Sequence, residues 1–310
     1  MRDQLRNITI YVLLASMIAI VPIGIARHML ANSRPDAFLQ DQPNYLSHLY
    51  PPRGKAELSQ KLAGLLDADF QQMSSVPRIY LSRLPEVLPT IYDAREKKRM
   101  FTSSMLPIIL RANELIIADR GRLIAILQKS TNNTPLQNAE KKWLLQTAKK
   151  YRVKLSPEPA PAEIEQLLFK IDIVPVSLAL AQAAIESGWG TSRFAQSGNA
   201  LFGEWVWDSS ADGIVPMGRD EGKTHRIKSF DYLLDSVRSY MTNLNRHNSY
   251  ADLRRRRAEL REHSLAVTGS ALAPALVDYS ERGKDYVNDV LSIINFNDLG
   301  ALDHALLGSS

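Results

Sequence analysis

The chain has 310 residues, 45% of them hydrophobic, so it is long enough to bury a sizeable core. The formal net charge is +5 and the sequence pI is near 9.3, which favours an anionic partner: nucleic acid, an anionic membrane surface or a carboxylate-bearing polymer. The absence of cysteine excludes disulfides, cysteine-ligated zinc and thiol nucleophiles.

The first predicted element is a membrane span. Residues 8–26 carry no charged side chain over 19 positions. As a helix they extend about 28 Å, close to the hydrocarbon thickness of a bilayer. Arg2 and Arg6 precede the span, so the positive-inside rule predicts a cytoplasmic amino terminus. A cleaved signal peptide is the alternative, but Ile25, Ala26 and Arg27 make a poor cleavage site. We expect a single-pass membrane anchor, with the rest of the chain exported from the cytoplasm.

The sequence then divides into segments of different composition. Residues 1–28 form the signal-anchor, and residues 29–54 are proline-rich and predict an extended spacer. Residues 55–134 predict a helical N-terminal region, with helices over 58–70, 94–101 and 107–128. Pro107 is expected to start the last of these, because proline is tolerated in a first helical turn. Residues 135–300 form the main domain, and residues 301–310 form a tail.

Three further helices are predicted over 137–151, 162–170 and 175–187. The last is apolar nearly all round and rich in alanine, which is typical of a helix buried in the centre of a domain. Residues 206–230 mix turn residues with alternating segments and predict a β-hairpin lobe. We detect no internal repeat.

One carboxylate ends the apolar helix. Glu186 lies in its last turn, and Gly188 is a natural residue to end the helix in the left-handed conformation. The negative end of the helix dipole and the apolar surroundings are both expected to raise the pKa of Glu186. A carboxylic acid that stays protonated near neutral pH can donate a proton to a glycosidic oxygen. The alternative is a glutamate that turns to solvent at a helix end.

The surrounding string AQAAIESGWGTSRFAQSGNALFG, residues 181–203, resembles the signature of the bacterial glucosaminidases of glycoside hydrolase family 73. Glu186 falls on the catalytic acid of that family. The family's turn matches Ser187, Gly188, Trp189, Gly190 and Ser192, and its next segment matches Asn199, Phe202 and Gly203. Tyr250, Tyr279 and Tyr286 resemble its later tyrosines. The resemblance covers roughly residues 138–298, and residues 98–123 further resemble the Bax-like branch of the group.

The resemblance implies an α+β, mostly α fold: a lysozyme-like helical bundle with a small β-hairpin lobe across a sugar-binding groove. It implies hydrolysis of the N-acetylglucosaminyl bond of peptidoglycan glycan strands, with Glu186 as general acid. Expected substrate-binding residues are Ser187, Trp189, Asn199, Phe202, Tyr250 and Tyr279. The sequence departs from the family at Glu204 and Trp205, where Ile-Lys is usual, so groove specificity stays open.

A second catalytic carboxylate is expected in the lobe. Glu221 is the preferred candidate and Asp220 the other, because the family's second glutamate also lies upstream of a phenylalanine that matches Phe230. Both residues also fit a plain turn between Arg219 and Lys223. The distance from Glu186 would separate direct displacement by water from a covalent or substrate-assisted route.

The remaining charged residues and the histidines do not indicate a further catalytic or metal site. Residues 254–257 are four arginines in a predicted helix, interpreted as a solvated face or an attraction to the anionic wall; nucleic acid is not an expected partner. The six histidines show no metal-ligand spacing, so we expect neither metal nor cofactor. Two other functions stay open: a lytic transglycosylase and a non-catalytic peptidoglycan-binding protein.

Overall fold

The computed structural model describes residues 49–50, 75–207, 212–216 and 224–308. The expected membrane anchor, residues 1–28, and the helix expected over 58–70 lie outside these residues. Among the described residues one helix, Ala94–Thr131, is long and apolar enough to span a membrane, and 78% of its apolar window is buried inside the protein. That burial is typical of the core helix of a globular domain.

Helices make up most of the described chain. They are α5 (Ala94–Thr131), α6 (Asn138–Tyr151), α7 (Pro161–Lys170), α8 (Val176–Ser187), α9 (Arg193–Gly198), α10 (Leu233–Arg246), α11 (Ala251–Glu262), α12 (Gly269–Leu272) and α13 (Lys284–Phe296), with the 3-10 turns η2 (Leu88–Thr90), η3 (Asn248–Tyr250), η4 (Ala273–Tyr279) and η5 (Leu299–His304).

The strands are short. β1 (Leu49–Tyr50) pairs in parallel with β2 (Tyr80–Leu81). β3 (Trp205–Val206), β4 (Gly213–Ile214) and β5 (Arg226–Lys228) form an antiparallel sheet in the order β3-β5-β4. The mostly helical α+β class with a small β lobe is therefore confirmed.

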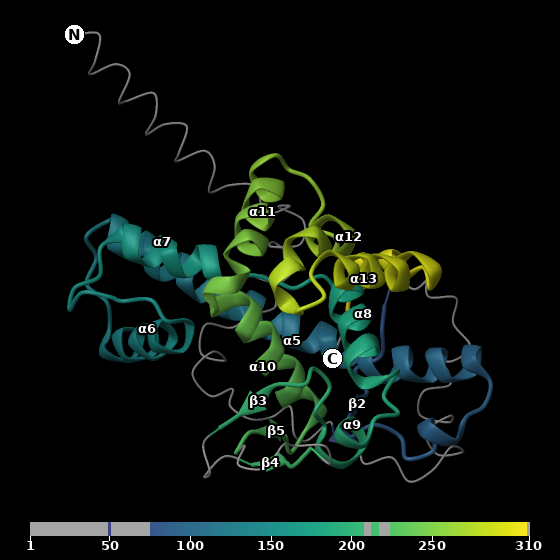
Figure 1. Ribbon diagram of the computed structural model, residues 1–310. Coiled ribbons are helices and arrows are strands. Elements are labelled where there is room, and N and C mark those ends of the chain that lie inside the picture. The colour runs from purple at the N-terminus through teal and green to yellow at the C-terminus, as the bar shows by residue number, and fades with distance from the viewer. Residues whose placement is uncertain (1–48, 51–74, 208–211, 217–223, 309–310) are drawn as a thin grey trace.

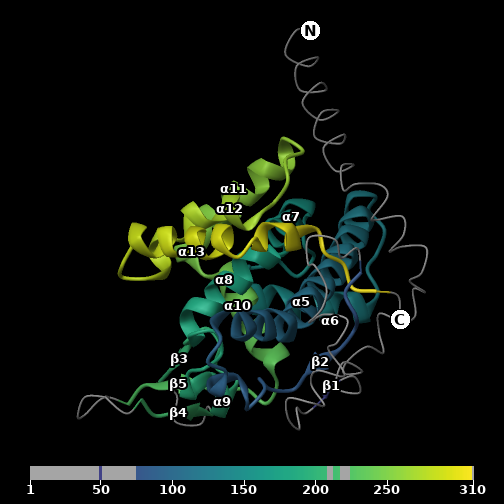
Figure 2. The ribbon, with the colours of Figure 1, turned by 90° about the vertical axis from the view of Figure 1, so that its right-hand side faces the viewer.

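Helix α8 lies at the centre of the fold. It packs against α5, α12, α13 and η5, with the sheet below it and α11, α12 and α13 above it in both views (Figures 1 and 2). Leu178, Ala179 and Ala181 are fully buried. The small alanine side chains let neighbouring helices approach closely, and on one side Gly269 leaves no room for a Cβ, which would stand 2.1 Å from Ser177 Oγ.

The helices predicted over 94–101 and 107–128 are one continuous helix, α5, and the prediction that Pro107 starts a helix is wrong. Proline lacks an N–H, so the backbone bond to the carbonyl four residues earlier is missing. Residues 100–110 are all buried, however, and this tertiary packing keeps the two halves in line.

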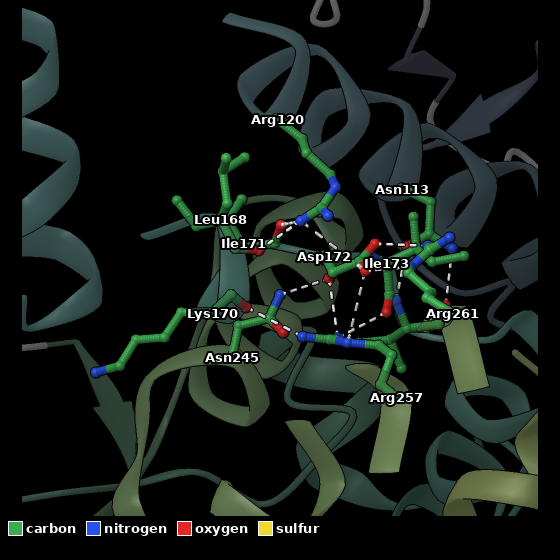
Figure 3. A network of polar contacts seen from close by, with 11 residues as sticks. Asn113, Arg120, Leu168, Lys170, Ile171, Asp172, Ile173, Asn245, Arg257 and Arg261 are labelled. Carbon is green, nitrogen blue, oxygen red and sulfur yellow. Dashed lines mark hydrogen bonds and ion pairs between the residues drawn. The ribbon is translucent and has the colours of Figure 1, made fainter. Parts of the chain in front are cut away.

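The segment that leads into α8 is held by arginines (Figure 3). Arg257 donates to the carbonyl oxygens of Lys170, Asp172 and Ile173 at 2.8–3.1 Å. Arg261 binds the Asp172 carboxylate through two bonds of 2.5 and 2.7 Å. Arg120 donates to the carbonyls of Leu168 and Ile171 and lies 3.9 Å from the same carboxylate.

This network corrects the interpretation of residues 254–257 as a solvated face. Arg254 and Arg257 are only 4% and 1% exposed, whereas Arg255 and Arg256 are exposed. Arg254 donates to the carbonyls of Leu244 and His247, at the end of α10. Within one helical run, two of the four arginines are therefore structural, because guanidinium groups can satisfy carbonyl oxygens that have no partner at helix ends.

Burial opposes ionisation of Asp172, but Arg257, Arg120 and Arg261 outweigh it and lower the pKa of Asp172 to about 2. Three cations thus surround one buried anion. Removal of the anion would leave the guanidinium group of Arg257 buried without compensation, which costs far more than the loss of a surface pair.

We predict that Asp172→Asn lowers the free energy of unfolding by about 3–5 kcal/mol. The depressed pKa means that the contribution of Asp172 is complete above pH 3.8 and is lost as pH falls from 3.8 through about 2. Urea denaturation across this range should show the wild-type advantage shrinking. The matched control is Asp252→Asn, whose side chain is 69% exposed and pairs with Arg255, and whose effect should stay below about 1 kcal/mol. Equal effects of the two substitutions would contradict the prediction.

Candidate active site

Helix α8 ends in a tight turn that needs glycine. Gly188 and Gly190 have φ values of +58° and +77°, and Trp189 between them is also left-handed at +56°. A Cβ on Gly190 would stand 2.6 Å from Leu88 and 2.9 Å from Phe101. The turn is thus pressed against α5 and the segment before it. Glu186, in the last turn of α8, is exposed.

Glu186 is exposed on one side and enclosed on the other. Its Oε1 accepts a hydrogen bond of 2.9 Å from the Tyr286 hydroxyl. Its Oε2 faces Gly203, where a Cβ would be 4.0 Å away. Partial burial raises the pKa of Glu186, and the bond from Tyr286 offsets part of that rise. The protonated form is therefore favoured more than in a free glutamate, and one side of the carboxyl group is open to solvent.

Tyrosines line the enclosed side. Tyr286 receives a bond of 3.0 Å from Gln182 Nε2, and the Tyr240 hydroxyl donates to Gln182 Oε1 at 2.6 Å. Phe202 stacks on Tyr240 with ring centroids 3.9 Å apart. Tyr279 stacks on Tyr286 at 5.2 Å and lies 5.8 Å from Tyr250. Residues from α8, α10, η3, η4 and α13 meet here. Figure 1 shows the positions of α8, α10 and α13.

The other expected substrate-binding residues are divided by burial. Tyr279 and Trp189 are partly exposed; Trp189 makes an edge contact with Phe101 at 5.7 Å. Phe202 and Tyr250 are buried at 6% and 8% exposure. Ser187 is fully buried, and its hydroxyl donates to the Ala183 carbonyl and accepts from Gly190 N. Its contacts therefore fix the turn.

Asn199 likewise supports backbone. Its Nδ2 donates to the carbonyls of Phe230 and Asp231 and so ties α9 to the lobe. Asn199 also lines a cavity of about 560 Å³ beside α9, with Arg83, Asp212 and Asp231. Neither Glu186 nor the tyrosines around it line this cavity, so it is separate from the Glu186 site.

The two candidates for the second carboxylate, Glu221 and Asp220, lie outside the described residues. The structure brings another carboxylate near the site: Glu204, whose neighbour Gly203 lies beside Glu186. Burial raises the pKa of Glu204, while the bond from Ser239 and the charges of Lys228 and Arg246 oppose the rise. Ser239 Oγ donates to Glu204 Oε2 at 2.8 Å, and Lys228 Nζ lies 3.9 Å from the same oxygen.

No motif in the sequence indicated Glu204 as part of the site. The signal was its departure from the usual Ile-Lys after Phe202-Gly203. Burial raises the pKa of Tyr250, and the negative charges of Glu186 and Glu204 raise it further. Tyr250 therefore lies close enough to both carboxylates to interact with them.

Trp205 and Trp207 are exposed by 53% and 66%, and His225 stacks on Trp205 at 4.3 Å. Alternation along β3 places the two tryptophans on the face opposite to Glu204. Within the described residues no group of three or more histidine, aspartate or glutamate side chains could hold a metal ion.

Comparisons with known proteins place the chain in a family. Residues 162–299 match the Glucosaminidase family, described as mannosyl-glycoprotein endo-beta-N-acetylglucosaminidase. The chain is 34% identical over 201 residues to Protein bax of Escherichia coli (strain K12). The aligned region covers 65% of this chain and 70% of that protein. No solved structure matches the chain significantly.

We predict that Tyr286→Phe raises the pKa of Glu186, because the lost hydrogen bond stabilises the charged form. The measurement is a titration of the chain with ¹³C-labelled glutamate by NMR, with Glu186→Gln used to assign the resonance. The midpoint for Glu186 should move to higher pH. An unchanged or lower midpoint would show that the bond does not stabilise the anion in solution.

Proposed function

Because this chain belongs to the Bax-like branch of the glucosaminidase group, we propose that it is a peptidoglycan hydrolase that cleaves the N-acetylglucosaminyl bond of glycan strands, with Glu186 as general acid. The family supports a glycoside-hydrolase-like enzyme in general. The observation that carries the finer proposal is the exposed Glu186 carboxyl, whose pKa is raised and whose Oε1 is held by Tyr286.

The proposed reaction is a hydrolysis. Glu186 gives its proton to the glycosidic oxygen, the bond between that oxygen and the anomeric carbon breaks, and a water oxygen bonds to the anomeric carbon. A second carboxylate, proposed to be Glu221, takes the proton that water releases. Tyr279, partly exposed beside Tyr286, offers an aromatic face to a sugar ring.

We also propose that the site works in the periplasm, with residues 1–28 as its inner-membrane anchor. The support is the uncharged run over 8–26 and the arginines before it. A glycan strand lies in that compartment, which suits the proposed substrate.

We predict that Glu186→Gln abolishes the release of reducing N-acetylglucosamine ends from purified peptidoglycan, with a loss of at least about 100-fold in kcat. Mass spectrometry of the released fragments provides the measurement. Glu262→Gln, an exposed glutamate at the end of α11, is the matched control and should keep full activity. Anhydro-muramyl ends would favour the lytic transglycosylase, and no new ends from the wild type would favour the binding protein.

For the second carboxylate, we predict that Glu221→Gln lowers kcat by at least about 100-fold. Glu204→Gln should lower it by less than about tenfold, because glutamine still accepts the hydrogen bond from Ser239. Both variants are measured on the same peptidoglycan preparation. The reverse order of effects would transfer the role to Glu204.

A further inference from the structure

We propose that Gln182 and Tyr240 are positioning residues that determine which oxygen of Glu186 carries the catalytic proton. The inference rests on the proposed function of Glu186 as the acid, and it adds two residues that do not touch the carboxyl group. It is drawn from a directed chain of hydrogen bonds that runs from the core to the site.

The chain has three links. The Tyr240 hydroxyl donates to Gln182 Oε1 at 2.6 Å. Gln182 Nε2 donates to the Tyr286 hydroxyl oxygen at 3.0 Å. The Tyr286 hydroxyl then donates to Glu186 Oε1 at 2.9 Å. In each link the hydrogen points toward Glu186.

Burial keeps these hydrogen bonds pointing in this direction. Tyr240 is 2% exposed and Gln182 is fully buried, so water does not replace a missing partner. In the part of the chain that the structure describes, the Tyr240 hydroxyl donates to Gln182 alone. If the Gln182 amide turned over, its N–H would point at Tyr240 and the buried Tyr240 hydrogen would lose its acceptor. A buried donor without a partner is costly, so the observed direction is favoured.

The consequence falls on the two oxygens of Glu186. Because Gln182 occupies the acceptor side of Tyr286, the hydrogen of Tyr286 is committed to Oε1. A proton on Oε1 would compete with that hydrogen, so the acid proton resides on Oε2. Oε2 is the oxygen beside Gly203, and the Glu186 side chain is exposed to solvent. The proton is therefore carried on the side from which a glycosidic oxygen can reach it.

The other groups that face Glu186 do not supply a competing bond. Its titratable neighbours in the described residues are tyrosines, from four elements: Tyr240 in α10, Tyr250 in η3, Tyr279 in η4 and Tyr286 in α13. Burial is the first cause that raises the pKa values of all four tyrosines, and their mutual proximity and the Glu186 carboxylate add to it, so they stay neutral at working pH. Beyond Tyr250 lie the acids Glu204 and Asp278. Among these tyrosines only Tyr286 donates a hydrogen bond to Glu186.

The test is Tyr240→Phe in the full chain, which keeps the ring that stacks on Phe202 and removes only the hydroxyl. Without that donor the Gln182 amide is free to turn over and accept the hydrogen of Tyr286, which is then withdrawn from Glu186. We expect kcat on peptidoglycan to fall by about tenfold with an unchanged KM. The basic limb of the kcat/KM profile should move to higher pH, in the same direction as for Tyr286→Phe.

Tyr151→Phe is the matched control. Tyr151 is 1% exposed in α6, and its hydroxyl bonds to Thr242, outside the chain that ends at Glu186. Its loss should leave the pH profile and kcat unchanged. Gln182→Met, which fills similar volume without hydrogen bonds, provides a second variant. It leaves the acceptor side of Tyr286 free, so the Tyr286 hydroxyl can turn and accept the proton of neutral Glu186. Because this stabilises the neutral acid, the Glu186 midpoint should again move to higher pH.

The NMR titration of Glu186 tests the same series of hydrogen bonds and does not require turnover of a substrate. A higher Glu186 midpoint in Tyr240→Phe supports the inference, and a midpoint and a basic limb equal to the wild type overturn it. Full turnover by Glu186→Gln would instead overturn the proposed function, so the two failures are distinguishable.

Discussion

The structure depends first on one buried anion, Asp172, and the arginines around it. The segment before α8 has no regular structure, yet it is buried and its carbonyl groups need donors. Arg257, from a distant helix, supplies them, and the Asp172 carboxylate balances the charge that this brings into the core. At the start of α8 Asp303 accepts bonds from the backbone N–H groups of Ser177 and Gly269. These contacts fix the start of α8. Because the helix is rigid, they also determine where Glu186 lies at its other end.

Burial of α8 also explains the contacts of its glutamine, Gln182. A glutamine in a helix of alanine and leucine has no water to bond, so Gln182 must find partners across helices. Tyr240 and Tyr286 provide them, and the second connects the core to Glu186. Satisfying one buried amide thus ties the catalytic candidate to α10 and α13. A fully satisfied network of this kind is rigid, which suits a group whose proton must be delivered in one direction.

The region before residue 162 lies outside the family match, but it forms part of the site's support. Phe101 of α5 packs against Trp189 and leaves no space for a side chain on Gly190. Lys98 lies over the Trp189 ring, 5.0 Å from its centroid. The turn after Glu186 is therefore shaped by a helix that the signature string does not contain, because left-handed backbone persists only where neighbours hold it.

Local patterns in the sequence were enough to identify α8 as a buried helix, Gly188 as its end and Glu186 as the notable carboxylate. Each depends on residues close along the chain, where periodicity and the freedom of glycine act directly. The continuity of α5 through Pro107, the burial of Arg254 and Arg257, and the position of Glu204 near the site depended on residues far apart in sequence. These three features cannot be predicted from the local sequence. A buried charge or a proline inside a helix is tolerated only when residues distant in sequence pack against it or bond to it, and only the tertiary fold brings those residues together.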